Sequence, residues 1–144
     1  MNLFKTMNIS ASALTAQGFR MDVIAQNIAN ANTTRTAEGG PYQRRAAILG
    51  QQQPSFAQAM RQAGQGPQVT GVNVVATVTD ETPGALVYDP QHPDANEQGY
   101  VAMPNVDIAR EYVDMISATR SYEANITVMN ATKRMAQKAL DISR

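Results

Sequence analysis

The chain has a single histidine, His92, which lies between Asp89 and Asp94 in the segment DPQHPD. An imidazole and two carboxylates are ligands that suit a transition metal, but Pro90 and Pro93 favour a rigid surface turn, and the turn is the better interpretation. Cysteine is absent, which excludes disulfides, cysteine-based zinc sites and thiol catalysis. The sequence contains no phosphate-binding loop, no dinucleotide-binding glycine motif and no His-Glu-x-x-His motif. We therefore predict no cofactor, no metal ion and no enzymatic activity.

Charge is balanced over the whole chain, with 12 basic and 12 acidic residues, but it is distributed unevenly. Residues 62–107 carry six acidic residues and no lysine or arginine, whereas residues 1–61 and 108–144 each carry an excess of basic residues. This asymmetry either sets the register between neighbouring chains of an assembly or is only a solvated acidic surface. The basic residues form no extended cluster, so nucleic acid is not a predicted partner. Glu111 and Asp114 are expected to lie on a solvated helix face.

The elements that would position these residues fall into three parts: residues 1–32, 33–103 and 104–144. Tryptophan is absent and aromatic residues make up only 6% of the chain, which predicts a poor single core. No run of about 18 apolar residues occurs, so no membrane span is predicted. The first residues, MNLFKTMNISASAL, lack the basic region and long apolar stretch of a cleaved signal peptide.

The first part is predicted to be a tube-forming helix over residues 7–30, about 36 Å long. Apolar or small residues recur at alternating spacings of three and four, which is typical of a coiled-coil seam. The seam consists of Met7, Ala11, Leu14, Gly18, Met21, Ala25 and Ile28. Asparagines gather where the helix should end, at Asn27, Asn30 and Asn32. They predict either a simple helix cap and turn or a hydrogen-bonded contact between subunits.

The third part is predicted to be a second tube-forming helix of about 54 Å, because no glycine or proline falls between residues 105 and 144. Its seam, interrupted at Lys133, consists of Ile108, Tyr112, Met115, Thr119, Tyr122, Ile126, Met129, Ala136 and Leu140. A helix of about 36 Å cannot cover one of about 54 Å. The seams therefore leave apolar surface that needs a partner chain, which predicts self-association through both sets of seam residues.

The middle part is predicted to be a small β region. A glutamine-rich segment at residues 50–68 reads as a flexible loop. Residues 69–79 alternate and predict a strand with one buried face, and residues 85–88 and 99–103 predict two shorter strands. The expected fold is thus mainly α with a small β element, in which the long N- and C-terminal helices pair as a coiled-coil-like hairpin around a central insert rich in β-hairpins.

Two segments carry a family resemblance. The segment IAQNIANANTTRTAEGGPYQRR resembles the asparagine-rich signature that follows the first helix of flagellar rod, hook and hook-associated proteins. The tracts GYVAMPNVD and SATRSYEAN resemble the C-terminal half of proximal rod proteins within that family. The turn at residues 34–40 is longer than the short form typical of the hook protein, which favours a rod protein.

The resemblance implies a structural subunit of the proximal rod of the bacterial flagellum, which assembles into a helical tube in the periplasm and transmits torque. It also implies export by the flagellar type III apparatus without a cleaved signal. The implied partners are copies of the chain, other proximal and distal rod proteins, and the adaptor at the base of the rod. A soluble helical-hairpin adaptor that binds one partner protein is the alternative function, and a hydrolase or metalloenzyme is a distant third.

Overall fold

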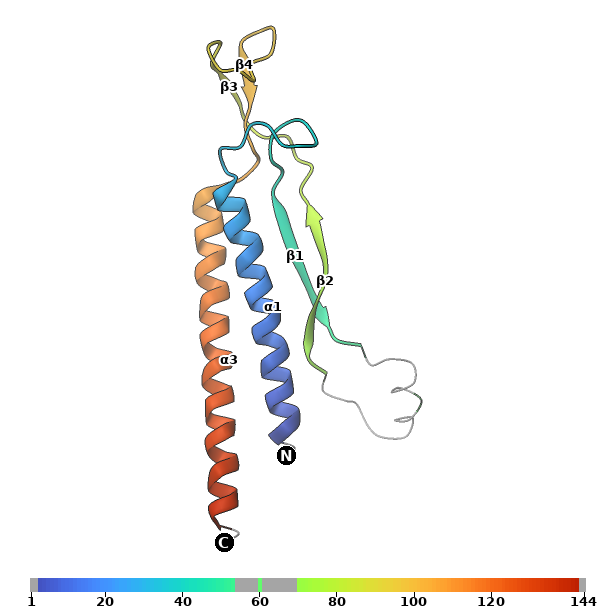
Figure 1. The fold of residues 1–144 in the computed structure, drawn as a ribbon, viewed down its shortest axis with the longest axis vertical. Helices are drawn as coiled ribbons and strands as arrows, with labels where there is room; N and C mark the ends of the chain where they lie inside the picture. Colours follow the sequence, from blue (N-terminus) through green and yellow to red (C-terminus); the bar gives the residue numbers. More distant parts are fainter. Residues whose placement is uncertain (1–2, 54–59, 61–69, 143–144) are drawn as a thin grey trace.

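The computed structural model describes residues 3–53, 60 and 70–142 and is dominated by two long helices (Figure 1). α1 (Leu3–Ala29) and α3 (Ile108–Ile142) lie side by side and run in opposite directions. Four short strands follow α1 in the described part of the chain, namely β1 (Arg45–Gln51), β2 (Val72–Thr79), β3 (Leu86–Tyr88) and β4 (Tyr100–Ala102). The predicted fold class is confirmed.

α1 starts at Leu3, before the predicted start at Met7, and ends at Ala29. Asn30 closes the helix, because its side-chain amide donates to the carbonyl of Gln26 (2.9 Å) and its own carbonyl accepts the backbone N–H of Thr33 (3.0 Å). Two sides of α1 are covered, one by α3 and the other by β1 and β2. α1 is therefore the central element of the molecule.

α3 is longer than α1, with 35 residues against 27. Asp107 caps its start, since its carboxylate accepts the backbone N–H of Ala109 (2.9 Å) and of Arg110 (3.3 Å). Among the described helices and strands α3 contacts α1 alone. Much of its surface is therefore uncovered within one chain.

β1 and β2 form an antiparallel pair in which Arg45 lies opposite Thr79. The register shifts after Ile48, so that Val75 of β2 has no partner on β1 and forms a bulge. The hydroxyl of Ser12 accepts the backbone N–H of Val72 (3.0 Å), which holds this sheet against α1.

The sequence did not predict β1. Its residues, RAAILGQ, place four apolar side chains in a row without the alternation that marks a half-buried strand. Gly50 and Gln51 were assigned to the glutamine-rich loop but belong to this strand. Most of the rest of that predicted loop, at residues 54–59 and 61–68, lies outside the described residues.

The strand predicted at residues 69–79 is confirmed in position, as β2, but its predicted burial is wrong. β2 starts at Val72 rather than at residue 69, and only Val72 and Val74 of its predicted inner face are half-buried. Ala76 and Val78 are exposed, because the sheet has only two strands.

β3 and β4 form a small hairpin beyond the end of the helix pair, at the positions predicted for the two shorter strands (Figure 1). The rings of Tyr88 and Tyr100 meet edge to face, with centroids 5.2 Å apart. The base of the hairpin is tight, since a Cβ at Gly84 would collide with the carbonyl of Met103. The hairpin contacts no other helix or strand of the described residues.

The apolar core is small, as the composition predicts. The buried apolar residues of the described chain are Ala16, Val23, Ile24, Ala31, Tyr42, Val101 and Ala118. Three of them, Ala16, Val23 and Ile24, lie on α1, which is covered by α3 on one side and by the sheet on the other. Larger apolar side chains remain outside, as on α3, where Val113 is 67% exposed.

Candidate assembly surface and its polar cluster

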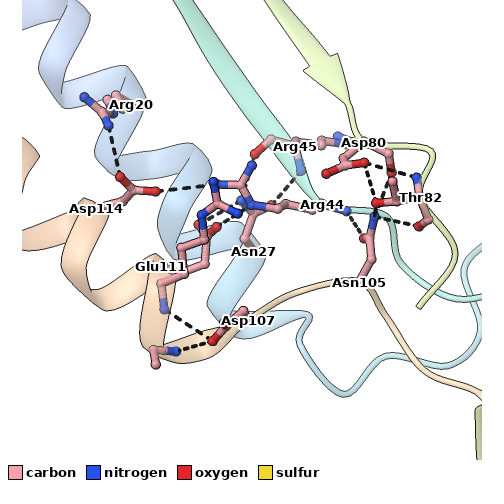
Figure 2. A network of polar contacts seen from close by, with 12 residues as sticks. Arg20, Asn27, Arg44, Arg45, Asp80, Thr82, Asn105, Asp107, Glu111 and Asp114 are labelled. Atoms are coloured by element: carbon pink, nitrogen blue, oxygen red, sulfur yellow. Dashed lines mark hydrogen bonds and ion pairs between the residues drawn. The ribbon is translucent and has the colours of Figure 1, made fainter. Parts of the chain in front are cut away.

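A buried polar cluster joins the helices to the sheet. It comprises Arg20 and Asn27 of α1, Arg44 just before β1, and Glu111 and Asp114 of α3 (Figure 2). The side chains of Asn27 and Glu111 have no solvent exposure. The carboxylate of Glu111 and the amide of Asn27 are therefore held away from water, where each needs a partner.

Glu111 is the centre of this cluster. One carboxylate oxygen accepts the Nε–H of Arg44 at 2.6 Å, and the other accepts the side-chain amide of Asn27 at 3.0 Å. Asp114, one turn further along α3, pairs with Arg44 at 3.5 Å and with Arg20 at 3.3 Å. Two guanidinium groups thus face two carboxylates, and the cluster has no net charge.

Asn27 binds the start of β1 as a neighbouring strand would. Its amide N–H donates to the carbonyl of Arg45 (2.8 Å), and its carbonyl oxygen accepts the backbone N–H of the same residue (3.0 Å). The same oxygen accepts the hydroxyl of Tyr42 (3.0 Å). One side chain of α1 therefore fixes both the position and the direction of the incoming strand.

Asn105 extends the connection from α3 to the end of β2. Its oxygen accepts the backbone N–H of Arg44 (2.7 Å), and its amide donates to the carbonyls of Asp80 (2.8 Å) and Thr82 (2.9 Å). Figure 2 shows how these contacts continue the cluster across the molecule. This one amide therefore holds the start of α3 to the end of β2.

Two titratable groups beside the cluster have shifted pKa values. Burial raises the pKa of Tyr42, with smaller opposing and supporting contributions from Arg45 and Glu111, so the phenol stays protonated and can donate to Asn27. Hydrogen bonds from Thr82 lower the pKa of Asp80. A lowered carboxyl pKa means that this small stabilisation is present above the ordinary pKa and is lost as the pH falls through the lowered value.

The contacts of the cluster join α1, α3 and the start of β1. A hollow of about 280 Å³ beside it has apolar walls from Val23, Ile24 and Leu49 and a charged rim. Within the described residues no group of three metal-ligating side chains occurs. The ring of His92 instead accepts the backbone N–H of Asp94 (3.1 Å), which stabilises its turn. None of the helices described in the structure could cross a membrane.

The predicted contact residues of α1 lie in three environments. Asn27 is buried, and most of the others, with Asn30, are half-buried. Ala11, Ala25 and Asn32 are exposed. The half-buried ones are Met7, Leu14, Gly18, Met21 and Ile28. The seam missed the buried residues Ser10, Ala16, Val23 and Ile24, because α1 is covered on two sides and its burial does not follow one stripe.

On α3, only about half of the predicted seam residues are on the side that faces α1. Most of the others lie one residue further along the helix than the buried positions. Met115, Thr119, Tyr122 and Met129 are half-buried, and Thr119 contacts the sulfur of Met21 at 3.7 Å. Ile108, Tyr112, Ile126 and Leu140 are exposed, at 42, 55, 38 and 69%. The buried positions missed by the seam are Glu111, Ala118 and Thr132, each seven residues or a multiple of seven apart. Glu111 was expected on a solvated face, and that expectation was wrong.

An apolar patch therefore remains on the outer side of α3. It consists of Ile108, Tyr112, Val113 and Ile116, all exposed, within about two turns of helix. On α1, Ala11 and Ala25 are also exposed, and a Cβ built at Gly18 would meet no atom within 4 Å. The molecule thus presents one bulky apolar face and one face of small side chains.

Comparisons with known proteins agree on one family. Residues 7–35 match the family model described as flagella basal body rod protein, and residues 97–142 match the model of the flagellar basal body rod FlgEFG protein C-terminal region. The flagellar basal-body rod protein FlgC of Bacillus subtilis (strain 168) is 48% identical over 150 residues, with 100% of both chains covered. The FlgC proteins of Borreliella burgdorferi and Escherichia coli O157:H7 are 43% and 38% identical, and the alignments cover 98–100% of each chain.

Proposed function

Because the chain belongs to the family of flagellar basal-body rod protein FlgC, we propose that its terminal helices form the contacts between subunits of a helical tube. The chain is a structural subunit of the flagellar basal-body rod, in its proximal part. The full-length relatives favour this role over a soluble adaptor. Their names describe a structural protein and not an enzyme.

The observation that carries the proposal is the apolar patch on α3. Its four large side chains are between 42 and 67% exposed, and no other described element covers that side of the helix. A contiguous apolar patch of this kind is typical of a protein–protein interface. We place residues 1–32 and 104–144 in the layer that forms the tube and residues 33–103 in a layer outside it.

The contact residues divide accordingly. The predicted seam positions that a neighbouring subunit can reach include Ala11, Gly18 and Ala25 on α1, with Ile108, Tyr112 and Ile126 on α3. Met115 and Tyr122 act within the chain by pairing the helices, and the amide of Asn27 is fully engaged in the polar cluster.

The export route, the periplasmic location, the transmission of torque and the partners are proposed from the family resemblance. The rod subunit would leave the cytoplasm through the flagellar type III apparatus without a cleaved signal and assemble in the periplasm, where the tube transmits torque. Its partners would be copies of itself, other proximal and distal rod proteins, and the adaptor at the base of the rod.

Complementation tests this role. A strain that lacks the gene should swim again when the intact gene is returned, and electron microscopy of the deletion strain should show basal bodies without a complete rod, hook or filament. A complete flagellum in the deletion strain would contradict the rod function and make the adaptor the working hypothesis.

Gly18→Ala tests the small-residue face of α1. Alanine should stabilise the isolated chain by about 0.5–1 kcal/mol, because glycine is unfavourable inside a helix and the site has room for a methyl group. The same methyl group should impair swimming if another helix packs closely there, since overpacking costs about 1–3 kcal/mol. Urea unfolding and a swimming assay measure the two effects.

Thr15→Ala is the matched control for this variant. Thr15 is exposed on α1, and its replacement also raises helix propensity but removes bulk instead of adding it. It should leave swimming unchanged. If Gly18→Ala is more stable and swims as well as the wild type, a close helix contact at Gly18 is ruled out.

A further inference from the structure

The β3–β4 hairpin is joined to the segment after α1 by one carboxylate. The hairpin contacts no other described helix or strand and stands beyond the end of the helix pair (Figure 1). From its turn at residues 89–99, Asp94 accepts the hydroxyl of Thr34 (2.8 Å) and pairs with Arg35 (3.4 Å). Among the side-chain hydrogen bonds and ion pairs of the described residues, those that join this turn to a part of the chain outside the hairpin all involve Asp94. These two contacts, the Asp94 bridge, therefore hold the turn in place.

His92 positions the backbone of Asp94. The backbone N–H of Asp94 donates to Nδ1 of His92 (3.1 Å), and the backbone N–H of Ala95 donates to the carbonyl of His92 (3.1 Å). A ring nitrogen of histidine accepts a hydrogen bond only when it carries no proton. The contact with Asp94 therefore requires the neutral ring with its proton on Nε2. A second proton, on Nδ1, would set a donor against a donor and remove the contact.

The charged groups around the ring act on the same bridge. Asp89 and Asp94 flank His92 in its own turn, and Arg35 faces the turn from the segment after α1. The carboxylate of Asp89 already accepts the backbone N–H of Gln91 (3.1 Å). The side chain of Asp94 is only 18% exposed, so its ion pair is partly shielded from water. A cationic imidazole would compete with Arg35 for this carboxylate as well as release its backbone N–H.

We propose that His92 makes the Asp94 bridge sensitive to pH, so that the turn of the hairpin is held to the segment after α1 while the ring is neutral and is released when the ring is protonated. Histidine is the side chain that changes charge between about pH 5 and 8. The neutral form makes the hydrogen bond, so its stabilisation is present at the upper end of this range and is lost as the pH falls. The proposal does not depend on the rod function.

Nuclear magnetic resonance of the untagged full-length protein tests the contact itself. The chain has one histidine, so the ring nitrogen signals belong to His92 without further assignment. At about pH 8 they should show a neutral ring with its proton on Nε2. The protection of the Asp94 amide from hydrogen exchange, corrected for the pH dependence of the chemical step, should fall about fivefold between about pH 8 and about pH 5, as expected for one hydrogen bond.

A distance measurement tests the release of the turn. The chain has no cysteine, so Gln98→Cys and Glu123→Cys allow one spin label on the turn and one on α3, both at exposed positions. The distribution of distances between the two labels should be narrow at about pH 8 and broader at about pH 5. Far-UV circular dichroism at both pH values should show that the helices are intact.

Two variants at His92 separate protonation of the ring from other effects of acid. His92→Asn keeps a side-chain acceptor for the backbone N–H two residues on but does not titrate, so the distance distribution should stay narrow at both pH values. His92→Ala removes the acceptor and should give a broad distribution at both. The proposal is overturned if the neutral ring carries its proton on Nδ1, if the wild-type distribution does not change with pH, or if His92→Asn responds to acid as the wild type does.

Discussion

Replacing Glu111 with alanine should lower the free energy of unfolding by about 3–5 kcal/mol, because removing one partner of a buried ion pair leaves the other uncompensated. The guanidinium of Arg44 would lose its 2.6 Å contact, and the amide of Asn27 would lose its 3.0 Å contact. Both lie where water has little access. Urea unfolding followed by far-UV circular dichroism measures the change.

Two further variants make this result specific. Glu123→Ala removes a glutamate of the same helix that is exposed, and it should change the stability by no more than about 0.5 kcal/mol. Glu111→Gln keeps one acceptor for Arg44 but brings an amide against the amide of Asn27, so an intermediate loss of about 1–3 kcal/mol is expected. If Glu111→Ala and Glu123→Ala unfold at the same urea concentration, the cluster does not hold the sheet to the helices.

The terminal helices could be predicted because their signals are local. Apolar and small residues recur at helical spacing in both, and residues 105–144 contain no glycine or proline. The two short strands of the β3–β4 hairpin were also predicted, since turn residues bound each of them. β1 had no such signal, because its burial comes from α1 beside it and not from an alternation of its own residues.

The polar cluster could not be predicted for a related reason. Glu111 and Asp114 stand in a charged stretch of α3 that resembles a solvated helix face. Only the antiparallel pairing brings Asn27 against Glu111, 84 residues away, and only the strand missed in the sequence brings Arg44 to the same place. The asparagine-rich segment did indicate a site in the sequence. It did not indicate which groups the asparagine side chains contact.

The orientation of α3 against α1 explains why the predicted seam includes exposed residues. The fully buried side chains of α3 are polar or small, namely Glu111, Ala118 and Thr132, and larger ones such as Met115 and Tyr122 are half-buried beside them. The bulkier apolar residues Tyr112 and Ile126 lie one position further around the helix and are exposed. A sequence pattern selects the most apolar stripe, and here that stripe includes much of the side of α3 that a single chain leaves uncovered.

Ile116→Asp should abolish swimming while leaving the isolated chain folded. Ile116 is 53% exposed and lies on the outer side of α3, so an aspartate there should change the free energy of unfolding by no more than about 0.5 kcal/mol. In an assembled rod the carboxylate would be buried without a partner, which costs several kcal/mol at every subunit contact. Met115→Asp would be less informative, because Met115 is half-buried toward α1 and its change would also disturb the fold.

Ile116→Val is the matched control, since it keeps an apolar side chain at the same position and should preserve swimming. Urea unfolding must show that Ile116→Asp has the wild-type stability, and immunoblotting must show that it is made in normal amounts. Electron microscopy should then reveal basal bodies without a complete rod. If cells with this variant swim normally, the patch at Ile108–Ile116 is not a subunit contact, and the lateral contacts must lie on another face of the helices.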